Sequence, residues 1–390
     1  MSPSPRRYDL DWLRVLAFGL LILYHTGMMY VAWPWHIESS HHSAALENLM
    51  LLVNQWRLPL LFLISGIAVH FLWRRVSTFG FLRLRSWRLL LPLAFGMLVV
   101  VPPQPYFELR QAGAIQPGYG EFLERYFQLG TPFFEAHFTW NHLWYLAYLW
   151  VYTLALVVLR PLLAWLRRAL AARRLAGAWR PWHLVVAPAL PLALAGVMLR
   201  ERYPSTHALA GDWYNHAIYF TVFVYGYWLG DGRRAWRLIV AARRCALATG
   251  VLLFGSLLVA LRGWVIDVPA EDWAFLRPLV YLNLWAWIVA ILGFARVHLD
   301  RPSLILGRLT PAVYPFYVLH QTITVVAGYW LVGLGLGPVL EPLFVVAATF
   351  GGCWLLYAWP ISRSRLLRPL FGLPARPRRP SGVRTGAAVA

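Results

Sequence analysis

The chain has 390 residues, of which 59% are hydrophobic and only 13% are charged. Soluble domains carry about 25% charged residues, so the composition excludes an ordinary soluble protein and predicts an all-α, polytopic membrane helix bundle. The net charge is +20, and all 36 basic residues are arginines. They cluster between apolar segments and at both ends, as topology determinants do, and form no contiguous basic patch. The expected partner is therefore the lipid bilayer and not nucleic acid.

The first apolar segment runs from about Leu10 to Trp33, long enough to cross a hydrocarbon core of about 30 Å as a helix. It is too long for a signal peptide, contains ionisable side chains and lacks a small-x-small cleavage site before further apolar segments. We therefore expect it to be retained as the first membrane helix.

Two ionisable side chains, Arg14 and His25, lie inside this first segment. Their separation is close to three helical turns, so both should lie on one face, about 16 Å apart along the axis. Ionisable groups near mid-membrane indicate a functional site. The structural alternative is a histidine that hydrogen-bonds a neighbouring helix. Asp11, one turn before Arg14, is positioned to pair with it.

Length and apolar content predict about ten membrane helices. Arginine clusters and acidic residues alternate between successive loops, and by the positive-inside rule both termini are then cytoplasmic. We expect a multipass protein of the bacterial cytoplasmic (inner) membrane. The ten approximate ranges are 12–33, 51–73, 88–104, 142–164, 183–200, 213–230, 245–262, 276–297, 312–333 and 336–359.

The longest outside segment, at about 105–140, is rich in aromatic residues and contains four glutamates. Within it, GYGEFLERYFQ predicts a short amphipathic helix on the membrane surface. Most of the aromatic side chains are expected to form a plain interfacial belt. The functional alternative is a platform of aromatic and acidic side chains for a polar acceptor such as a sugar.

Two domains are expected: a transmembrane domain at 1–372, and a disordered, basic cytoplasmic tail at 373–390 that is rich in Pro, Gly, Ala and Arg. Cys245 and Cys353 lie in or beside predicted helices and are expected to be free thiols. No Cys and His cluster has zinc spacing, so the sequence predicts no metal site and no permanently bound cofactor.

Arg85 and Arg88 lie at the predicted cytoplasmic entrance of the third helix, within RLRSWRLLLP. Their i, i+3 spacing puts two guanidinium forks on one face, which suits bidentate binding of phosphates. The structural alternative is that they only flank a membrane helix, as topology requires.

Two further histidines fall in predicted helices. His142 begins the fourth helix in HLWYL, beside Trp144 and Tyr145, and His320 lies about eight residues into the ninth. A histidine at a helix mouth beside tryptophan is often only an interfacial side chain. We expect His142, Trp144, Tyr145 and His320 to line the acceptor side of a pocket.

These positions suggest different roles for the three arginines and for His25. Arg14, Arg85 and Arg88 lie near the predicted cytoplasmic face, where a phosphate-rich cytosolic molecule arrives. His25 lies towards the outer half, where neutral imidazole is suited to act as a general base on a hydroxyl. Transfer of a group from a cytosolic donor to an outside acceptor follows from this layout. The oxyanion-stabilising donor cannot be assigned from the sequence, and a covalent acyl-histidine route is also open.

A transporter or flippase is the alternative from a different class, with His25 and His320 in a proton or substrate pathway. Two observations count against it, because the sequence has no apparent inverted repeat and no helices broken by Gly or Pro in matching positions. A non-catalytic scaffold is a second alternative, but it does not explain why Arg14 and His25 lie in a membrane helix.

The sequence resembles acyltransferase family 3, the multipass membrane acyltransferases, over nearly its whole length. The spacing Arg-x10-His in the first helix and Arg-x2-Arg in the third are together fairly specific, whereas the other motifs alone are weak. The opening also resembles the branch that includes glucan-biosynthesis succinyltransferases. The motifs that carry the resemblance are LDWLRVLAF…LYH, LPLLFLISG, RSWRLLLP, HLWYL and YPFYVLH, in the order typical of the family.

The resemblance implies an acyl-CoA donor, here acetyl-CoA or succinyl-CoA, and an extracytoplasmic hydroxyl acceptor, commonly a carbohydrate or glucan. It implies that His25 is the catalytic histidine, and that Arg14, Arg85 and Arg88 bind the phosphates of CoA or orient the donor. Because the predicted C-terminal tail is short, we expect no fused hydrolase-like domain of the kind that some members carry. Neither the acyl group nor the acceptor follows from the residues themselves.

Overall fold

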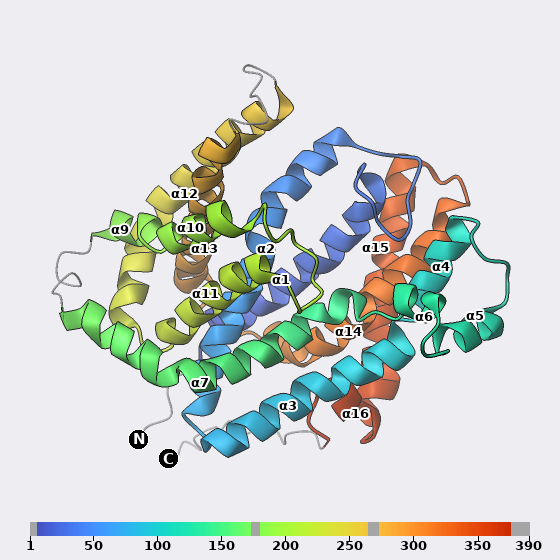
Figure 1. Cartoon of the computed structure of the whole chain (residues 1–390), viewed down its shortest axis with the longest axis horizontal. Helices are drawn as coiled ribbons and strands as arrows, with labels where there is room; N and C mark the ends of the chain where they lie inside the picture. The colour runs from blue at the N-terminus through green and yellow to red at the C-terminus, as the bar shows by residue number, and fades with distance from the viewer. Residues whose placement is uncertain (1–5, 173–179, 264–272, 376–390) are drawn as a thin grey trace, which may run out of the picture.

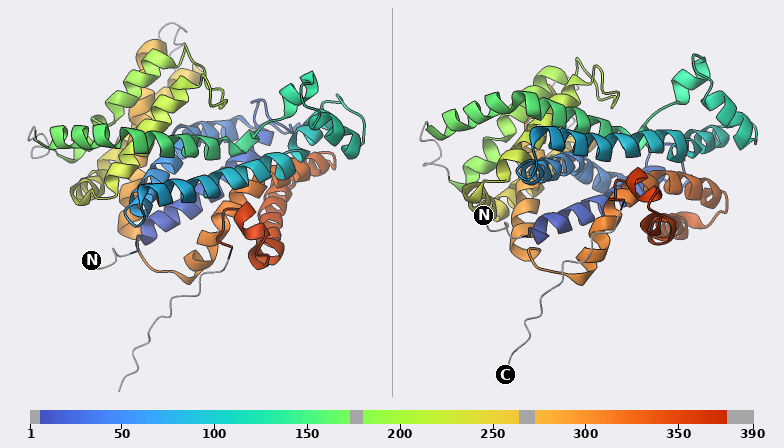
Figure 2. Two further views of the ribbon diagram at one scale, coloured as in Figure 1. Left: turned by 60° about the horizontal axis from the view of Figure 1, so that its bottom comes forward. Right: turned by 90° about the horizontal axis from the view of Figure 1, so that it is seen from below.

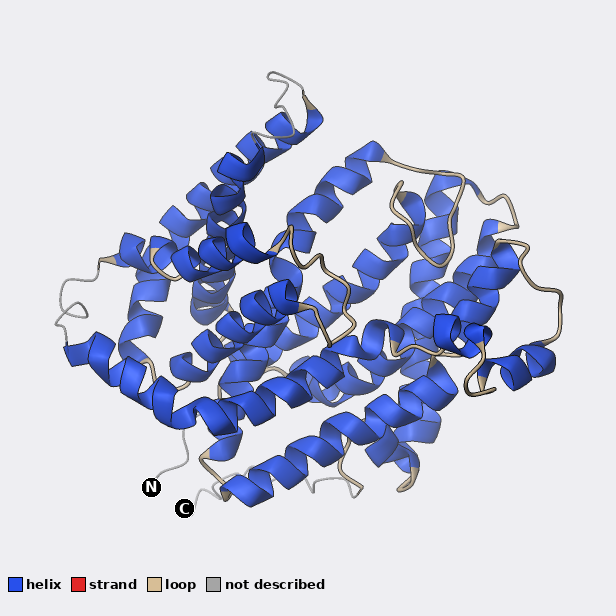
Figure 3. Cartoon of the chain, viewed as in Figure 1, coloured by secondary structure: helices blue, strands red, loops and turns tan. Residues whose placement is uncertain are grey.

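The computed structural model describes residues 6–172, 180–263 and 273–375. All regular structure in these ranges is helical, and none of it is β-strand (Figure 3). The prediction of an all-α bundle is therefore confirmed.

The membrane-length helices fall close to the predicted segments, with short helices between some of them. In chain order they are α1 (Tyr8–Gly27), α2 (Ala44–Trp73), α3 (Thr78–Phe95), α4 (Pro103–Gln111), α5 (Tyr119–Tyr126), α6 (Pro132–His137), α7 (Trp144–Ala172), α9 (Pro181–Val186), α10 (Ala189–Leu199), α11 (Trp213–Leu229), α12 (Arg233–Arg262), α13 (Trp273–His298), α14 (Leu304–Val332), α15 (Gly337–Leu356) and α16 (Leu367–Leu370).

Within the described residues, eight helical segments are long and apolar enough to cross a membrane. Two of the ten predicted helices are not among them. One is α11, with 17 residues, and the other is α14, which has a polar stretch at His320–Thr324. Both still form helices inside the bundle, so each predicted segment coincides with a helix.

Several helices begin earlier than their apolar pattern suggests. The side chain of Ser77 caps α3 by accepting a hydrogen bond from the backbone N–H of Gly80 at 3.2 Å. Arg85 and Arg88 therefore lie about two turns inside α3 and not at its entrance. In the same way α14 starts at Leu304, so His320 lies in the middle of the helix. Long arginine side chains allow such a helix to extend beyond its apolar core.

A close contact between α2 and α11 depends on two glycines. A Cβ atom added to Gly66 would lie 2.0 Å from the carbonyl oxygen of Phe223, and one added to Gly226 would lie 2.0 Å from that of Leu63. Only glycine permits this approach of the two backbones. Gly66 ends the LPLLFLISG motif, so that motif places α2 against α11.

The helices form two groups around α1 and α2 (Figures 1 and 2). In one group α12 and α10 pack on α13, which also contacts α2; in the other, α14 packs on α15, α1 and α4. Figure 1 shows α3 and α7 side by side across the bundle. The inward faces of α1, α2, α3, α7 and α14 surround the region described below.

The predicted outside segment contains three short helices, and α5 confirms the helix predicted for GYGEFLERYFQ. The expectation of a plain aromatic belt is wrong for three of its residues. Tyr106, Phe122 and Tyr126 are buried and form a small core of their own. Edge-on and tilted contacts among these rings bury their apolar area within the protein.

The end of the predicted transmembrane domain packs on the bundle. Phe371, just after α16, contacts Phe95 of α3 with ring centroids 5.4 Å apart. Residues 376–390 of the predicted tail lie outside the described residues, so its disorder stays a prediction.

Candidate active site

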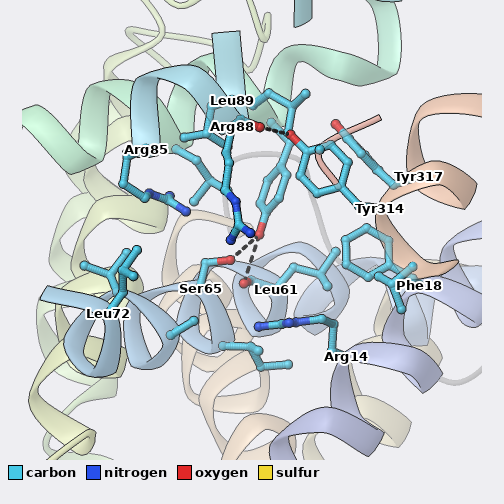
Figure 4. A pocket seen from close by; sticks show the side chains of 18 of the residues that line it. Arg14, Phe18, Leu61, Ser65, Leu72, Arg85, Arg88, Leu89, Tyr314 and Tyr317 are labelled. Atoms are coloured by element: carbon cyan, nitrogen blue, oxygen red, sulfur yellow. Dashed lines mark hydrogen bonds between the residues drawn. The ribbon is translucent and has the colours of Figure 1, made fainter. Parts of the chain in front are cut away.

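Three arginines that the sequence singles out line one cavity. Arg14 of α1 and Arg85 and Arg88 of α3 border a space of about 290 Å³, which we call the Arg cavity. In Figure 4 the side chain of Arg14 enters from one side and those of Arg85 and Arg88 enter from the opposite side. Three cations around one cavity can bind an anionic ligand such as a phosphate group.

One of these arginines, Arg85, has a donor left for a ligand. Nε of Arg85 donates to Oγ1 of Thr153 at 3.2 Å, whereas its Nη2 is buried and has no partner among the described residues. The predicted pair between Asp11 and Arg14 is wrong. Asp11 pairs with Arg6 at 2.8 Å, because Arg6 folds back over the start of α1 while Arg14 turns into the cavity.

A second, larger cavity of about 530 Å³ is lined by His25, His36, His142 and His207. We call it the His cavity. Trp144 and Tyr145 also line it, as predicted from the HLWYL motif. The connection between α1 and α2 contributes Pro34 to His36 to its wall.

One face of α1 borders both cavities. Arg14 and Phe18 line the Arg cavity, and Leu21 and His25 line the His cavity. These positions follow the spacing of successive helical turns. Arg14 and His25 therefore share one face, as the sequence predicts.

The two cavities adjoin each other. Leu61, Tyr145 and Tyr317 line both of them. The hydroxyl of Tyr145 donates to the carbonyl oxygen of Leu61 at 3.0 Å and accepts from the hydroxyl of Ser65 at 2.8 Å. These contacts fix the ring of Tyr145 at the boundary.

His25 and His320 form a hydrogen-bonded pair with Nδ1 of His25 3.0 Å from Nε2 of His320. The other nitrogen of His320, Nδ1, lies 2.8 Å from the carbonyl oxygen of Tyr317 and 3.1 Å from that of Phe316. A carbonyl oxygen only accepts, so Nδ1 of His320 is protonated and its Nε2 accepts when the ring is neutral. His25 must then donate from Nδ1, which leaves a lone pair on Nε2.

Nε2 of His25 makes none of the hydrogen bonds found within 6–172, 180–263 and 273–375, and His25 lines the His cavity. His25 thus presents a basic nitrogen to that cavity. His320 is fully buried and lines neither of the two cavities. It touches the lining residues His25, His142 and Tyr317 from behind, whereas the sequence predicts it as a lining residue itself.

His142 lines the His cavity, but both of its ring nitrogens have partners. Nε2 lies 3.1 Å from the carbonyl oxygen of Val318, and Nδ1 lies 3.4 Å from the amide nitrogen of Gln104. Tyr317 donates from its hydroxyl to the backbone carbonyl of His142 at 2.7 Å. These bonds join the start of α7 to the middle of α14.

A polar network that the sequence did not indicate extends along the same wall. Nε2 of Gln321 contacts Oδ1 of Asn141 at 2.9 Å, Oε1 of Gln104 at 3.0 Å and Nε2 of His36 at 3.0 Å. Nδ1 of His36 bonds Glu108 of the predicted outside segment. Such a wall of amides and imidazoles offers donors and acceptors to a hydroxylated ligand.

The loop before α11 closes another side of the His cavity with Thr206 and His207. Asp212 holds this loop by accepting from the backbone N–H groups of Thr206 at 3.3 Å and His207 at 3.1 Å. The ring of His207 lies against that of Trp144, with centroids 4.1 Å apart. Burial lowers the pKa of His207, although Asp212 opposes the shift, so His207 is neutral at pH 7.

Sequence reasoning also missed Arg57, a buried residue of α2 that lines the His cavity. It is the one charged side chain in the sequence between Glu47 and Arg74, and that position inside a membrane segment was the signal. Among the described residues, no group of three or more His, Cys, Asp or Glu side chains could hold a metal ion.

Compared with known protein families, residues 7–358 of the sequence match the family described as an acyltransferase domain. This chain belongs to acyltransferase family 3. Together with the eight membrane-length helices of the described residues, the family makes this an integral, multipass membrane protein. No solved structure matches it.

Its curated relatives include the glucans biosynthesis protein C of Escherichia coli strain K12 and of E. coli O1:K1 / APEC. Each is 26% identical over 164 residues, which is 42% of this chain and 40% of the relative. The match thus spans less than half the length of these relatives.

Proposed function

We propose that this protein is an O-acyltransferase that takes an acyl group from acyl-CoA and transfers it to a hydroxyl of a carbohydrate acceptor. The observation that carries the proposal is the adjacency of two cavities with different chemistry. One has three arginines, the other has His25, and they share Leu61, Tyr145 and Tyr317. In the proposed complex the phosphates of CoA bind in the Arg cavity. The thioester end of the donor then extends past these three shared residues towards His25.

His25 is the proposed general base. The acceptor oxygen attacks the thioester carbonyl carbon, and its proton moves to Nε2 of His25. The carbonyl electron pair moves to oxygen, which becomes an oxyanion. When this intermediate collapses, the C=O bond reforms, the C–S bond breaks, and the thiolate of CoA takes the proton from Nε2. The hydrogen bond to His320 stabilises the imidazolium formed between the two steps.

Acetyl-CoA and succinyl-CoA are the proposed donors, and a glucan or related carbohydrate is the proposed acceptor. The size and polar wall of the His cavity suit a hydroxylated ligand. The name of the relatives, glucans biosynthesis protein C, supports a glucan. The arginine clusters support a cytoplasmic Arg cavity, an extracytoplasmic acceptor and a place in the bacterial inner membrane. Family membership favours this function over a transporter or flippase.

Purified protein in detergent provides the test, with acetyl-CoA and succinyl-CoA as ligands. Arg14→Ala should bind both donors much more weakly than wild type. His25→Ala should bind them normally but lose the release of free CoA in the presence of a gluco-oligosaccharide. His42→Ala, at an exposed histidine outside both cavities, is the control. Failure of wild type to bind either CoA ester would reject the proposed function.

A further inference from the structure

The His cavity contains a cation, Arg57, that forms no ion pair with any residue that the structure describes. This side chain is 5% exposed and lines the cavity together with His25. Its Nε and Nη1 atoms are buried and have no hydrogen-bond partner among the described residues. None of the ion pairs within those residues includes it. Keeping a buried cation unpaired is costly for a folded protein, so its retention requires a reason.

The principal contact of Arg57 is aromatic. Its guanidinium carbon lies 3.4 Å from the centroid of the Tyr24 ring. A ring face attracts a cation but does not neutralise it or satisfy its N–H donors. This contact therefore orients the guanidinium group and leaves its hydrogen-bonding capacity unused.

The position of Arg57 along α2 places it close to the boundary between the cavities. Arg57 and Leu58 line the His cavity, Leu61 lines both cavities, and Ile64 and Ser65 line the Arg cavity. Arg57 is thus one helical turn from the boundary, on the same side as His25. Tyr24, on whose ring the guanidinium group of Arg57 packs, directly precedes His25. The ring centroids of Tyr24 and His25 are 6.3 Å apart.

We propose that Arg57 is the residue that stabilises the oxyanion of the tetrahedral intermediate. The inference rests on the proposed acyl transfer. Attack by the acceptor oxygen on the thioester carbon moves the carbonyl electron pair onto oxygen, while the proton goes to His25. Arg57 donates N–H groups to that oxygen, and the charge is released when the C=O bond reforms and the thiolate leaves. A cation that is already fixed beside the reacting carbonyl does this without reorganisation.

This chemistry explains why no carboxylate in the described parts of the chain pairs with Arg57. A resident carboxylate would neutralise the guanidinium before the oxyanion forms. The negative charge arises on the substrate only transiently, beside the base that removes the proton. The three arginines of the Arg cavity lie on the other side of Leu61, where they bind the phosphates of CoA in the proposed complex.

The test compares Arg57→Met and Arg57→Lys with wild type, with acetyl-CoA and succinyl-CoA as donors and a gluco-oligosaccharide or water as acceptor. Arg57→Met should lower kcat by about 10²- to 10³-fold, the loss typical of one oxyanion donor. Binding of both donors should not change, and thermal stability should not fall. Arg57→Lys, which keeps the charge in the cavity, should retain part of the activity.

Arg160→Met is the matched control, because Arg160 is exposed and lies 4.6 Å from the centroid of the Trp73 ring, outside both cavities. An equal loss of kcat with both donors supports the inference. A loss confined to succinyl-CoA overturns it, since Arg57 would then recognise a carboxylate. A loss no larger than that of Arg160→Met also overturns it. Inactive wild type would overturn the proposed function itself, which separates the two failures.

Discussion

Nε2 of His320 lies 3.0 Å from Nδ1 of His25, and the two rings stack with centroids 5.0 Å apart. The backbone carbonyls of Phe316 and Tyr317 set the tautomer of His320, and His320 sets that of His25. The proposed base is thereby oriented from α14, a helix that begins almost 300 residues later in the chain.

Removing the imidazole of His320 should slow turnover without weakening donor binding. In His320→Ala, Nδ1 of His25 loses its acceptor, so the ring can take the other tautomer or another rotamer. We expect kcat to fall by about 10- to 100-fold, which is less than the 10²- to 10⁴-fold that a general base itself contributes, while KM for the donor changes little. His320→Gln, which keeps an acceptor oxygen, should be less impaired.

Thr349→Val serves as the control for His320, because Thr349 is a buried hydroxyl of α15 outside both cavities. Steady-state kinetics separate the effects on kcat and KM. If His320→Ala raised KM and left kcat unchanged, the orienting role of His320 would be rejected.

The Arg cavity predicts a difference between arginines of one helix. Arg85→Gln should weaken binding of acetyl-CoA by about 10-fold or more, since a charge-assisted hydrogen bond contributes about 1.5–3 kcal/mol. Arg83→Gln removes an exposed arginine of the same helix that does not line the cavity, and should leave binding unchanged. Calorimetry of donor binding in detergent measures both. Equal effects of the two changes would mean that only general positive charge matters.

The close approach of α2 and α11 predicts a large effect of one methyl group. In Gly66→Ala the new Cβ would lie 2.0 Å from a backbone oxygen, so the helices must separate. We expect a loss of at least about 1–3 kcal/mol in stability, as for overpacked cores, and a lower unfolding temperature. Gly255→Ala, in α12 with no atom within 4 Å of the new Cβ, should be neutral or stabilising.

The loop beside the His cavity predicts a pH dependence. Burial alone would raise the pKa of Asp212, but hydrogen bonds from Tyr148, Asn215 and the Thr206 N–H lower it below its ordinary value. A lowered carboxyl pKa contributes stability that is present above about pH 4 and is lost as the pH falls through the folded-state pKa. The stability difference between wild type and Asp212→Asn should therefore be constant from pH 5 to 8 and shrink below pH 4.

Thermal unfolding of Asp212→Asn and of Asp11→Asn at several pH values checks this. Asp11 forms a surface pair with Arg6, and its loss should change stability little at any pH. A difference for Asp212→Asn that grows as the pH falls would contradict the assignment.

Features that depend on local periodicity and composition could be predicted from the sequence alone. Apolar length predicts the helices, and helical spacing puts Arg14 and His25 on one face of α1, where the structure has them. Helix ends were less predictable, as the early start of α3 at Thr78 shows, because caps and arginine stems extend a helix beyond its apolar pattern.

Which side chains meet depends on how the helices pack in three dimensions. The partner of His25 is 295 residues away, and Arg57 enters the His cavity through the packing of α2 beside α1. A single sequence does not encode the rotation of one helix against another in any local pattern. That rotation follows from close packing of many side chains at once, including the contact at Gly66 and Gly226. The tautomer of His25 and the unpaired charge of Arg57 are consequences of that packing.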